Sequence, residues 1–447
     1  MSYQQSLKSV LLSLVLMVGF ASAYAQHAKN VIIISIDGFR PDFYLDPAWG
    51  AINMQEMVKA GAHATGVNSI FPTLTFPNHT AIITGVKSAK HGIYFNAPFG
   101  GAETEWYWYS KDIKAQTLWD AAKEHNMTTV SVNWPVSAGA PVTYNIPIIK
   151  RKGEPQLQVM KEFSTPGLIA DIEENATGKL DQNSLNTDGE YLVVDENVAR
   201  IAGYLFRKHK PALTTLRLSC TDHFEHQQGR EGELVKKAVS GADRAIGTIL
   251  ESVKMVGLAD STIIIICGDH GFVDTHTGLK PNTWLVNAGL MGKNKEQAWK
   301  AQFNTTGGSA FLMLKDPNDT QTKKKVEHIL KMLSPGIKKL FRVIDRNELD
   351  RIGTAPNAAL ALAAIQGVVF NASLEGSLIM PVKSGTHGYF PDSKEIQTGF
   401  IVYGAGIRKG VTIPVMDIID IAPLVAQMLG IALIGAEGVA YPGVLLK

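Results

Sequence analysis

Cysteine is scarce in this sequence, and neither sign of charge predominates. The 447 residues include 2 cysteines, 43 lysines and arginines, and 41 acidic residues. A chain this long needs no disulfide framework, so we expect Cys220 and Cys267 to be buried thiols at the ends of apolar runs. The near-neutral charge balance gives no support for a nucleic-acid duplex or a membrane surface as partner. An apolar content of 45% is ample for a large core.

The chain also lacks a hydrophobic run long enough to cross a membrane. The longest candidate, residues 10–20, is too short for a transmembrane helix. Lys8 precedes this run and Ala23-Tyr24-Ala25 follows it, which is the organisation of a secretory signal peptide. A first helix of the folded domain is the alternative, but the polar residues 26–29 interrupt it. Residue 26 is glutamine, whereas a lipoprotein would have cysteine. We therefore expect residues 1–25 to be a signal peptide and the protein to be periplasmic or secreted.

Internal repeats and low-complexity linkers are absent from the sequence. Apolar β-branched runs alternate with segments of helical spacing, as in an α/β fold with parallel strands buried on both faces. We expect strands at residues 31–36, 128–133, 213–219, 262–267 and 399–403. We expect helices at residues 52–60, 117–124, 231–255 and 417–429, and another from residues 73–76 to about 85. The pattern predicts a three-layer sandwich, with helices on both faces of a mostly parallel central sheet.

Two segments interrupt this alternation. One covers residues 138–191 and is rich in proline, glycine, lysine and glutamate. The other covers residues 278–384 and has its own strand at 310–314 and helix at 323–333. We interpret both as insertions that cap a single catalytic domain formed by residues 26–447.

Acidic residues follow three of the expected strands. Asp37, Asp222 and Asp269 each lie one to three residues past a strand, and functional side chains of α/β sheets gather beyond the carboxyl ends of strands. Histidines stand nearby in sequence or in a separate Gly-Thr-His-Gly segment. Carboxylates and imidazoles in this mixture suit zinc, and six ligands are enough for two ions. The expected ligands are Asp37, Asp222, His226, Asp269, His270 and His387.

The spacing of Asp222 and His226 allows both to bind one ion if the segment turns helically, because residues four apart share a helix face. The two residues between them that carry ionisable side chains, His223 and Glu225, would then face elsewhere. We interpret them as bystanders.

Thr75 offers a hydroxyl within the segment Phe-Pro-Thr-Leu-Thr-Phe-Pro-Asn-His. Threonine is nearly inert at its own pKa, but a zinc ion bound to its oxygen would stabilise the alkoxide. Pro72 and Pro77 stiffen the turn, and a helix that begins here would direct backbone N–H groups at an anionic phosphoryl group. The alternative is that Thr73 or Thr75 merely caps the helix. The acids and histidines elsewhere in the chain favour Thr75 as a nucleophile.

These segments resemble the nucleotide pyrophosphatase/phosphodiesterase family of the alkaline phosphatase superfamily, from residue 31 to about residue 431. The resemblance implies an alkaline-phosphatase-like fold with two Zn²⁺ ions. It assigns Asp37, Thr75, Asp269 and His270 to one ion, and Asp222, His226 and His387 to the other. It also implies that Asn96, in a His-Gly-Ile-Tyr-Phe-Asn segment, donates to a phosphoryl oxygen; an Asx-turn role is the alternative.

The implied geometry predicts a mechanism in two steps. Two ions about 4 Å apart would activate Thr75 for in-line attack and stabilise the departing oxygen. The resulting phosphothreonine would be hydrolysed by water from the opposite side. Two in-line displacements predict net retention of configuration at phosphorus.

The substrate class is less constrained than the chemistry. Thr75 lacks the Cys/Ser-x-Pro-x-Arg context of sulfatases, and no arginine clamp typical of classical phosphomonoesterases is evident near it. These absences favour a small, nucleotide-like phosphate diester, whose base could stack on Phe76, Trp134 or an aromatic residue of 105–109 unless these pack in the core. The alternatives are a hydrolase of phosphonates or small phosphomonoesters, and a non-catalytic zinc-binding protein. Intact Thr75 and Asn96 argue against the last of these.

Overall fold

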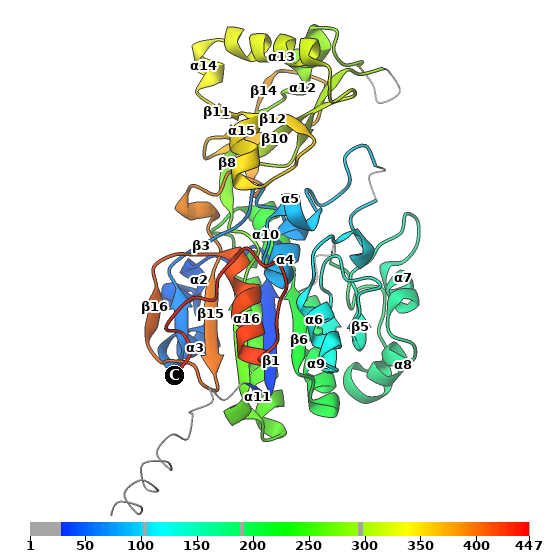
Figure 1. Cartoon of the computed structure of the whole chain (residues 1–447), viewed down its shortest axis with the longest axis vertical. Helices are drawn as coiled ribbons and strands as arrows, with labels where there is room; N and C mark the ends of the chain where they lie inside the picture. The colour runs from blue at the N-terminus through cyan, green and yellow to red at the C-terminus, as the bar shows by residue number, and fades with distance from the viewer. Residues whose placement is uncertain (1–27, 102–104, 188–191, 294–297, 447) are drawn as a thin grey trace, which may run out of the picture.

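An eight-stranded sheet forms the centre of the larger of two lobes (Figure 1). The computed structural model describes residues 28–101, 105–187, 192–293 and 298–446, so the expected signal peptide lies outside the described residues. In spatial order the strands are β16 (Val411–Ile413), β2 (Ala62–Ala64), β15 (Phe400–Gly404), β7 (Thr262–Cys267), β1 (Asn30–Ile36), β6 (Leu213–Leu218), β4 (Thr129–Val132) and β5 (Tyr144–Ile146).

The sheet is mostly parallel, as expected. β1 pairs in parallel with β6 and β7, and β4 pairs in parallel with β6 and β5. The strand expected at residues 399–403 is present as β15, but its expected parallel orientation is wrong, because β15 runs antiparallel to both β7 and β2. An apolar run reports burial on both faces of a sheet, and an internal antiparallel strand has the same burial as a parallel one.

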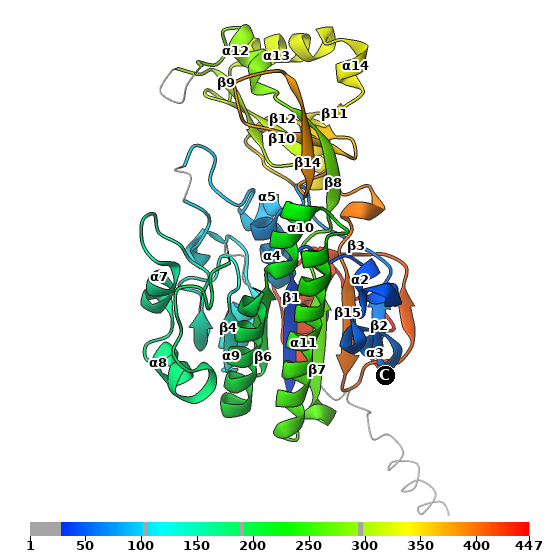
Figure 2. The same ribbon diagram turned by 180° about the vertical axis from the view of Figure 1, so that it is seen from behind.

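Helices cover both faces of the sheet, as predicted. Along β1, Ile32 and Ile34 face a core formed with α3, α9 and α11, whereas Val31 and Ile33 face a second core formed with α4, α6 and α16. This alternation is the two-residue period of a strand. Figure 1 shows α6 and α16 in front of the sheet, and Figure 2 shows α9 and α11 in front of its other face. These helices are α3 (Ile52–Ala60), α4 (Thr75–Thr84), α6 (Leu118–Glu124), α9 (Val193–His209), α11 (Glu233–Met255) and α16 (Ile421–Leu429).

The expected helices agree with the structure in most places. The helix expected at residues 417–429 begins as the 3-10 turn η6 (Ile418–Asp420) and continues as α16. α9 was not among the expected helices, although Val194, Val198, Ile201 and Leu205 have helical spacing and are buried. The remaining helices of the larger lobe are α2 (Asp42–Leu45), α5 (Ser88–His91), α7 (Gln156–Phe163), α8 (Leu168–Ile172) and α10 (Cys220–Gln228).

The smaller lobe stands above the carboxyl ends of the central strands (Figure 1) and is built from the segment around residues 278–384. It contains the four-stranded sheet β11-β12-β10-β9 and its own hydrophobic core. A three-stranded sheet, β13-β8-β14, joins the lobes. The elements are β8 (Val273–Leu279), α12 (Asn282–Asn287), β9 (Ala301–Thr305), β10 (Ser309–Leu314), α13 (Thr320–Met332), α14 (Pro335–Lys338), β11 (Phe341–Ile344), α15 (Arg346–Ile352), β12 (Ala358–Ala364), β13 (Val368–Phe370) and β14 (Ile379–Thr386).

The segment 138–191 lies elsewhere, beside the edge of the central sheet. Its strand β5 extends that sheet next to β4, and α7 and α8 lie beyond it (Figure 1). A two-stranded sheet, β17 (Met416–Asp417) with β3 (Val67–Asn68), completes the fold. Cys220 and Cys267 are free and buried, which confirms the expectation for both thiols. Among the described residues, no helix is both long enough and apolar enough to span a membrane.

Candidate metal centre and nucleophile

The residues expected to bind metal meet at the carboxyl ends of the central strands. Asp37 directly follows β1, and Asp269 and His270 follow β7. Asp222 and His226 lie on α10, which begins two residues after β6, and His387 directly follows β14. Thr75 is the first residue of α4. Because parallel strands end at one edge of their sheet, segments distant in the sequence converge there.

Six of these seven side chains form two neighbouring groups. Asp37, Asp269 and His270 each offer a ligand atom within 4.8 Å of the others, and so do Asp222, His226 and His387. In the first group, Nε2 of His270 lies 3.4 Å from Oδ1 of Asp37 and 3.1 Å from Oδ2 of Asp269. In the second group, Oδ1 of Asp222 lies 3.5 Å from Nε2 of His226 and 3.6 Å from Nε2 of His387. The rings of His270 and His387 stack with centroids 3.7 Å apart, so the groups adjoin.

The three histidines share one hydrogen-bonding arrangement. In each, Nδ1 lies within hydrogen-bonding distance of a backbone carbonyl, which accepts only if Nδ1 carries the proton. The neutral imidazole then has its lone pair on Nε2, the atom that faces the carboxylates. The pairs are His226 with Gly385 at 3.2 Å, His270 with Gly271 at 3.1 Å, and His387 with Thr73 at 2.9 Å.

The carboxylates have unused ligand atoms at the same place. Oδ1 of Asp37, Oδ1 of Asp222 and Oδ2 of Asp269 are buried without a hydrogen-bond partner. Buried polar atoms are normally paired, because leaving one unpaired costs about 1–3 kcal/mol. Unpaired carboxylate oxygens that face imidazole lone pairs are the donor set of a divalent cation. The side chains therefore fit two metal ions, one in each group.

Arg217 is a buried cation beside the first group. Its Nε donates to Oδ2 of Asp37 at 2.8 Å, and its Nη2 donates to the same oxygen. Burial alone would raise the pKa of Asp37, but Arg217 and, more weakly, His270 hold it well below its usual range. Asp37 therefore keeps its charge and has Oδ1 available. The sequence analysis missed Arg217, although a lone arginine within an apolar strand is a signal, because a buried cation requires a partner.

Thr75 begins α4 beside the first metal group. Its Oγ1 is 3.4 Å from Nε2 of His270. His79, one turn later, uses Nδ1 to hydrogen-bond the carbonyl of Thr75 at 2.8 Å and Nε2 to hydrogen-bond Oγ of Ser35 at 2.9 Å. Asn78 holds the preceding turn through the carbonyls of Pro72 and Leu74. Hydrogen bonds from Asn78 and His79 thus hold the first turn of α4 and the turn before it. His79 is a second residue that the sequence analysis missed.

Asn96 is attached to the same turn. Its Oδ1 accepts a hydrogen bond from the backbone N–H of Phe76 at 3.0 Å, and this determines which end of the amide is Nδ2. Phe76 therefore donates to Asn96, and Pro77 has no N–H. Of the first three residues of α4, only Thr75 can present a backbone N–H to a ligand. An ordinary helix start offers several free N–H groups, so this one offers fewer.

The aromatic residues near Thr75 have different environments. Phe76 packs edge to face against Trp106 at 5.1 Å and Trp108 at 5.5 Å, and the two tryptophans stack on each other. Trp106 is 37% exposed, whereas Trp108 is buried. Trp134 is completely buried and packs edge to face against His79. Trp134 therefore belongs to the core, and Trp106 is the exposed aromatic side chain of this cluster.

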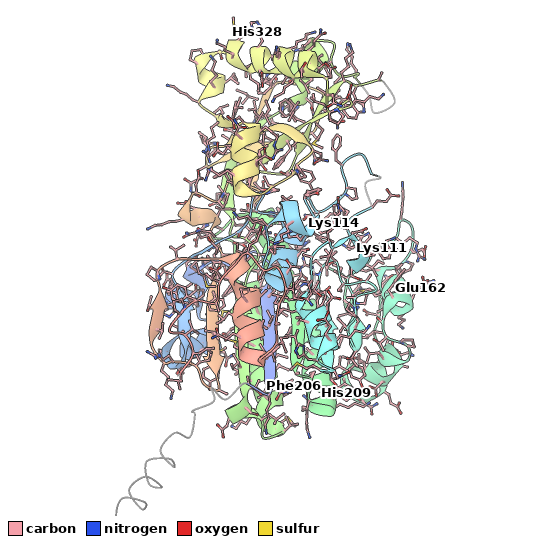
Figure 3. The ribbon with its side chains drawn as sticks, in the orientation of Figure 1. Lys111, Lys114, Glu162, Phe206, His209 and His328 are labelled. Carbon is pink, nitrogen blue, oxygen red and sulfur yellow. The ribbon has the colours of Figure 1, made fainter. Side chains whose placement is uncertain are left out.

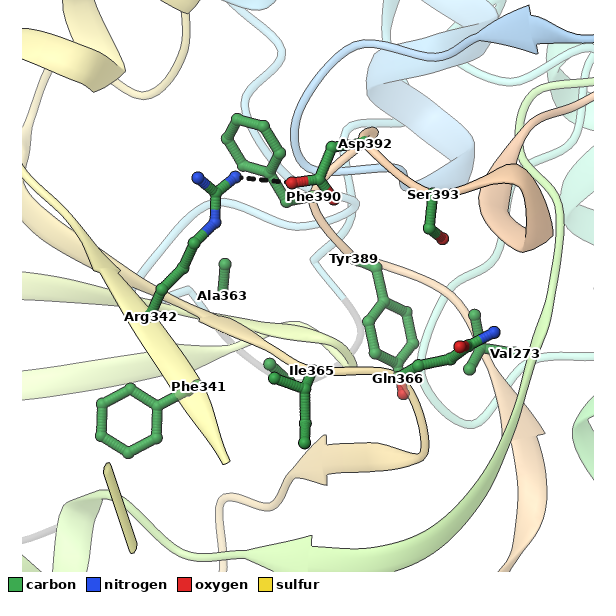
Figure 4. A pocket seen from close by; sticks show the side chains of 11 residues that line it. Val273, Phe341, Arg342, Ala363, Ile365, Gln366, Tyr389, Phe390, Asp392 and Ser393 are labelled. Carbon is green, nitrogen blue, oxygen red and sulfur yellow. Dashed lines mark hydrogen bonds and ion pairs between the residues drawn. The ribbon is translucent and has the colours of Figure 1, made fainter. Parts of the chain in front are cut away.

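The smaller lobe contacts the segment that carries His387. The carbonyl of His387 accepts from the N–H of Gly308, and Oγ1 of Thr73 donates to the carbonyl of Tyr389. Behind this segment lies a cavity of about 320 Å³ between β11, β12 and residues 389–393 (Figure 4). At its rim Arg342 donates to Asp392 at 2.9 Å and lies over the ring of Phe390. The position of His387 therefore depends on both the turn before Thr75 and the smaller lobe.

Two further histidines lie far from this centre, and a glutamate next to it has a partner of its own. His328 is at the top of the smaller lobe and His209 is at the opposite end of the molecule (Figure 3). Glu225, which we interpreted as a bystander, is completely buried and pairs with Arg40. Glu225 belongs to neither metal group, and its charge partner comes from a segment far away in the sequence.

Comparison with known proteins agrees with this geometry. The family model described as type I phosphodiesterase / nucleotide pyrophosphatase matches residues 31–364. Ectonucleotide pyrophosphatase/phosphodiesterase family member 7 of Rattus norvegicus is 23% identical over 94% of this chain and 87% of its own length. Family member 3 of Rattus norvegicus is 22% identical over 90% of this chain, which spans 42% of the relative.

Solved structures show the same fold. Human ectonucleotide pyrophosphatase / phosphodiesterase 5 superposes with a TM-score of 0.67 at 18% identity, over 92% of this chain and 97% of the human chain. An inactive variant of the murine protein, solved in complex with AMP, superposes with a TM-score of 0.66 over the same shares of both chains. With the family model matching most of its length, the chain belongs to the type I phosphodiesterase / nucleotide pyrophosphatase family of the alkaline phosphatase superfamily.

Proposed function

We propose that this protein is a two-zinc phosphodiesterase that hydrolyses nucleotide-like phosphate esters through a phosphothreonine intermediate. The observation that carries the proposal is the convergence of two donor groups next to a helix-terminal hydroxyl, with the Nε2 lone pairs and the unpaired carboxylate oxygens facing each other. Asp37, Thr75, Asp269 and His270 would hold one ion, and Asp222, His226 and His387 the other. When bound, the ions supply Lewis-acid stabilisation of the charges that develop on the attacking, transferred and leaving oxygens.

The side chains of the protein define the remaining steps. Oγ1 of Thr75 gives up its proton to solvent and forms a bond to phosphorus, the ester P–O bond on the opposite side breaks, and the leaving alcohol departs with a proton from solvent. Water then displaces Oγ1 from phosphorus and regenerates the threonine. Asn96 donates from Nδ2 to a non-bridging oxygen in both steps, because its Oδ1 is held by the N–H of Phe76.

A nucleotide-like substrate is supported by the surroundings of Thr75 and by the relatives. Trp106 presents an exposed aromatic face next to Phe76, on which a base can stack. One relative, 22% identical over 90% of this chain, is the bis(5'-adenosyl)-triphosphatase of Bos taurus.

A comparison of two aryl esters tests the proposal. The zinc-loaded protein should hydrolyse the 4-nitrophenyl ester of thymidine 5'-monophosphate with kcat/KM at least about 100-fold above that for 4-nitrophenyl phosphate, a difference of about 3 kcal/mol in transition-state stabilisation. Release of 4-nitrophenolate measures both reactions. A higher kcat/KM for the monoester would replace this proposal with the phosphomonoesterase alternative.

Zinc affinity should fall as the pH decreases below 7. Burial, with a further contribution from Asp37, raises the pKa of Asp222 in the metal-free protein to about 7. Zinc requires the carboxylate, so below this pKa one proton must leave Asp222 when the ion of its group binds, and the affinity of that site should fall about tenfold per pH unit. Burial lowers the pKa of His270 to about 4. Above pH 5 its imidazole is therefore neutral, and no proton has to leave it when zinc binds. Titration with a zinc chelator between pH 5.5 and 8 measures this slope, and equal affinities throughout would contradict it.

We further propose that residues 1–25 direct export to the periplasm or out of the cell, and that residues 26–447 form one catalytic unit. In this proposal the segments 138–191 and 278–384 act as caps that shape the substrate site. The second is placed to do so, because it stands over the carboxyl ends of the strands and contacts the segment that carries His387.

A further inference from the structure

A buried ion pair connects the two segments that carry the metal groups. Nη1 of Arg40 donates to Oε1 of Glu225 at 2.8 Å, and both side chains are 0% exposed. Arg40 lies three residues after Asp37, in the segment of the first group. Glu225 lies on α10 between Asp222 and His226, in the segment of the second group. The pair is thus a direct link between one ligand of the first ion and two ligands of the second.

Close packing makes this link stiff. Gly38 follows Asp37, and a Cβ on it would lie 2.7 Å from Oε2 of Glu225. A Cβ on Gly385, two residues before His387, would lie 2.3 Å from the carbonyl oxygen of Glu225. Two glycines therefore let the segments of Asp37 and of His387 lie directly against Glu225. A shift of this residue would move both neighbouring segments or clash with them.

The guanidinium of Arg40 has a second set of partners on the other side. Its Nε and Nη2 donate to the two carboxylate oxygens of Asp42 at 3.1 and 2.6 Å, and Nη1 also donates to the carbonyl of Arg230 at 2.9 Å. Arg40 is thereby held within its own segment before it reaches α10. Because the guanidinium is planar and one of its edges is fixed by Asp42, its other edge has a defined position for Glu225. A flexible lysine side chain would not have this property.

An ion pair in this place has no advantage from stability alone. Removing two charges from water costs several kcal/mol per ion, and an apolar pair of the same volume is often at least as stable. A charged hydrogen bond has a preferred length and direction, whereas an apolar contact has neither. Oε2 of Glu225 is moreover buried without a hydrogen-bond partner, which lowers the free energy of unfolding.

We propose that Arg40 and Glu225 are positioning residues that set the separation of the two metal groups. The inference rests on the proposed two-zinc function. It assigns no contact with substrate to either residue: the pair acts through Asp37 on one side and through Asp222 and His226 on the other.

Two variants of Glu225 separate a positional role from an electrostatic one. Glu225→Gln keeps the length of the side chain and an oxygen acceptor for Arg40 but removes the charge. Glu225→Asp keeps the charge but shortens the side chain by one methylene, so the bond to Arg40 can form only if the two segments move together. A positional role predicts that the aspartate variant is the more impaired, and a purely electrostatic role predicts the reverse.

The measurement is the pair of stepwise zinc dissociation constants of the metal-free protein, obtained by competition with a chromophoric chelator. We expect Glu225→Asp to weaken one step by at least tenfold and to lower kcat more than it changes KM, and Glu225→Gln to stay within about threefold of wild type. Asp42→Asn is the matched control, because it removes the other carboxylate of the same arginine without touching α10. It should leave both constants within about twofold. Thermal unfolding of each metal-free variant establishes that it is folded.

The possible outcomes are distinct. Wild-type constants for Glu225→Asp, or a greater loss for Glu225→Gln than for Glu225→Asp, would overturn the positional role while leaving the two-zinc function intact. An equal loss in Asp42→Asn would show that Arg40 acts only within its own segment and would also overturn it. If the wild-type chain binds fewer than two zinc ions, the proposed function fails together with this inference.

Discussion

Replacing Thr75 with alanine should abolish turnover and leave the metal centre intact. The proposed nucleophile is Oγ1 of Thr75, and the atom is 3.4 Å from Nε2 of His270. Without it no phosphothreonine can form, and removal of a nucleophile that works with fixed partners costs about 10⁴-fold or more in kcat. The side chain loses only a hydroxyl and a methyl group, and six protein ligands remain for the two ions. Assay of a nucleotide diester together with the zinc content of the variant measures both expectations.

The control for this variant lies five residues further along α4. Thr80 is also buried and donates to the carbonyl of Phe76, outside the metal groups. Thr80→Ala should retain activity within a few fold. Stereochemistry gives an independent measurement, because attack by Thr75 followed by attack of water predicts net retention with a substrate chiral at phosphorus. Inversion, or turnover by Thr75→Ala close to that of wild type, would refute Thr75 as nucleophile.

Replacing His387 with alanine should remove one of the two ions. His387 reaches Asp222 at 3.6 Å, and its Nδ1 is held by the carbonyl of Thr73. The variant leaves Asp222 and His226 as the protein ligands of that ion, fewer than the three that a catalytic zinc site normally has. We expect one zinc per chain after dialysis, and a fall of about 10³-fold in kcat, since a metal ion contributes several kcal/mol to transition-state stabilisation. Metal analysis and steady-state kinetics measure the two effects.

His276→Ala is the matched control for this change. His276 lies on β8 next to Thr277, is exposed, and belongs to neither metal group. It should keep two zinc ions and wild-type turnover. Retention of both ions in His387→Ala would place the second ion elsewhere and would contradict the assignment of this group.

Much of the fold could be predicted because its signals are local. The β-branched run of β1 and the apolar spacing of α3 and α11 follow from the period of each element and need no knowledge of neighbours. The direction of β15 could not be predicted in this way. Its residues are buried by α-helices on both faces whichever way it runs, and only the path of the chain through the smaller lobe determines its orientation.

In the candidate site too, some residues could be predicted from local sequence and others could not. Asp37, Asp222 and Asp269 could be expected at one edge because each follows a strand, and the helical turn that brings Asp222 and His226 together is local as well. The partner of a buried charge is not a local property. Arg217 meets Asp37 across β6 and β1, and Arg40 meets Glu225 across segments far apart in the chain.

The sequence by itself determined the class of chemistry, since carboxylates, imidazoles and a threonine hydroxyl have their ligand and nucleophile properties wherever they stand. It also determined the edge at which most of them would lie, because that edge follows from parallel strands. Only the tertiary structure decided which histidine nitrogen faces the carboxylates and which cations pair with those carboxylates. The physical reason is that a donor set is defined by distances of a few ångströms, and those distances arise only when the strands, α10 and the smaller lobe pack together.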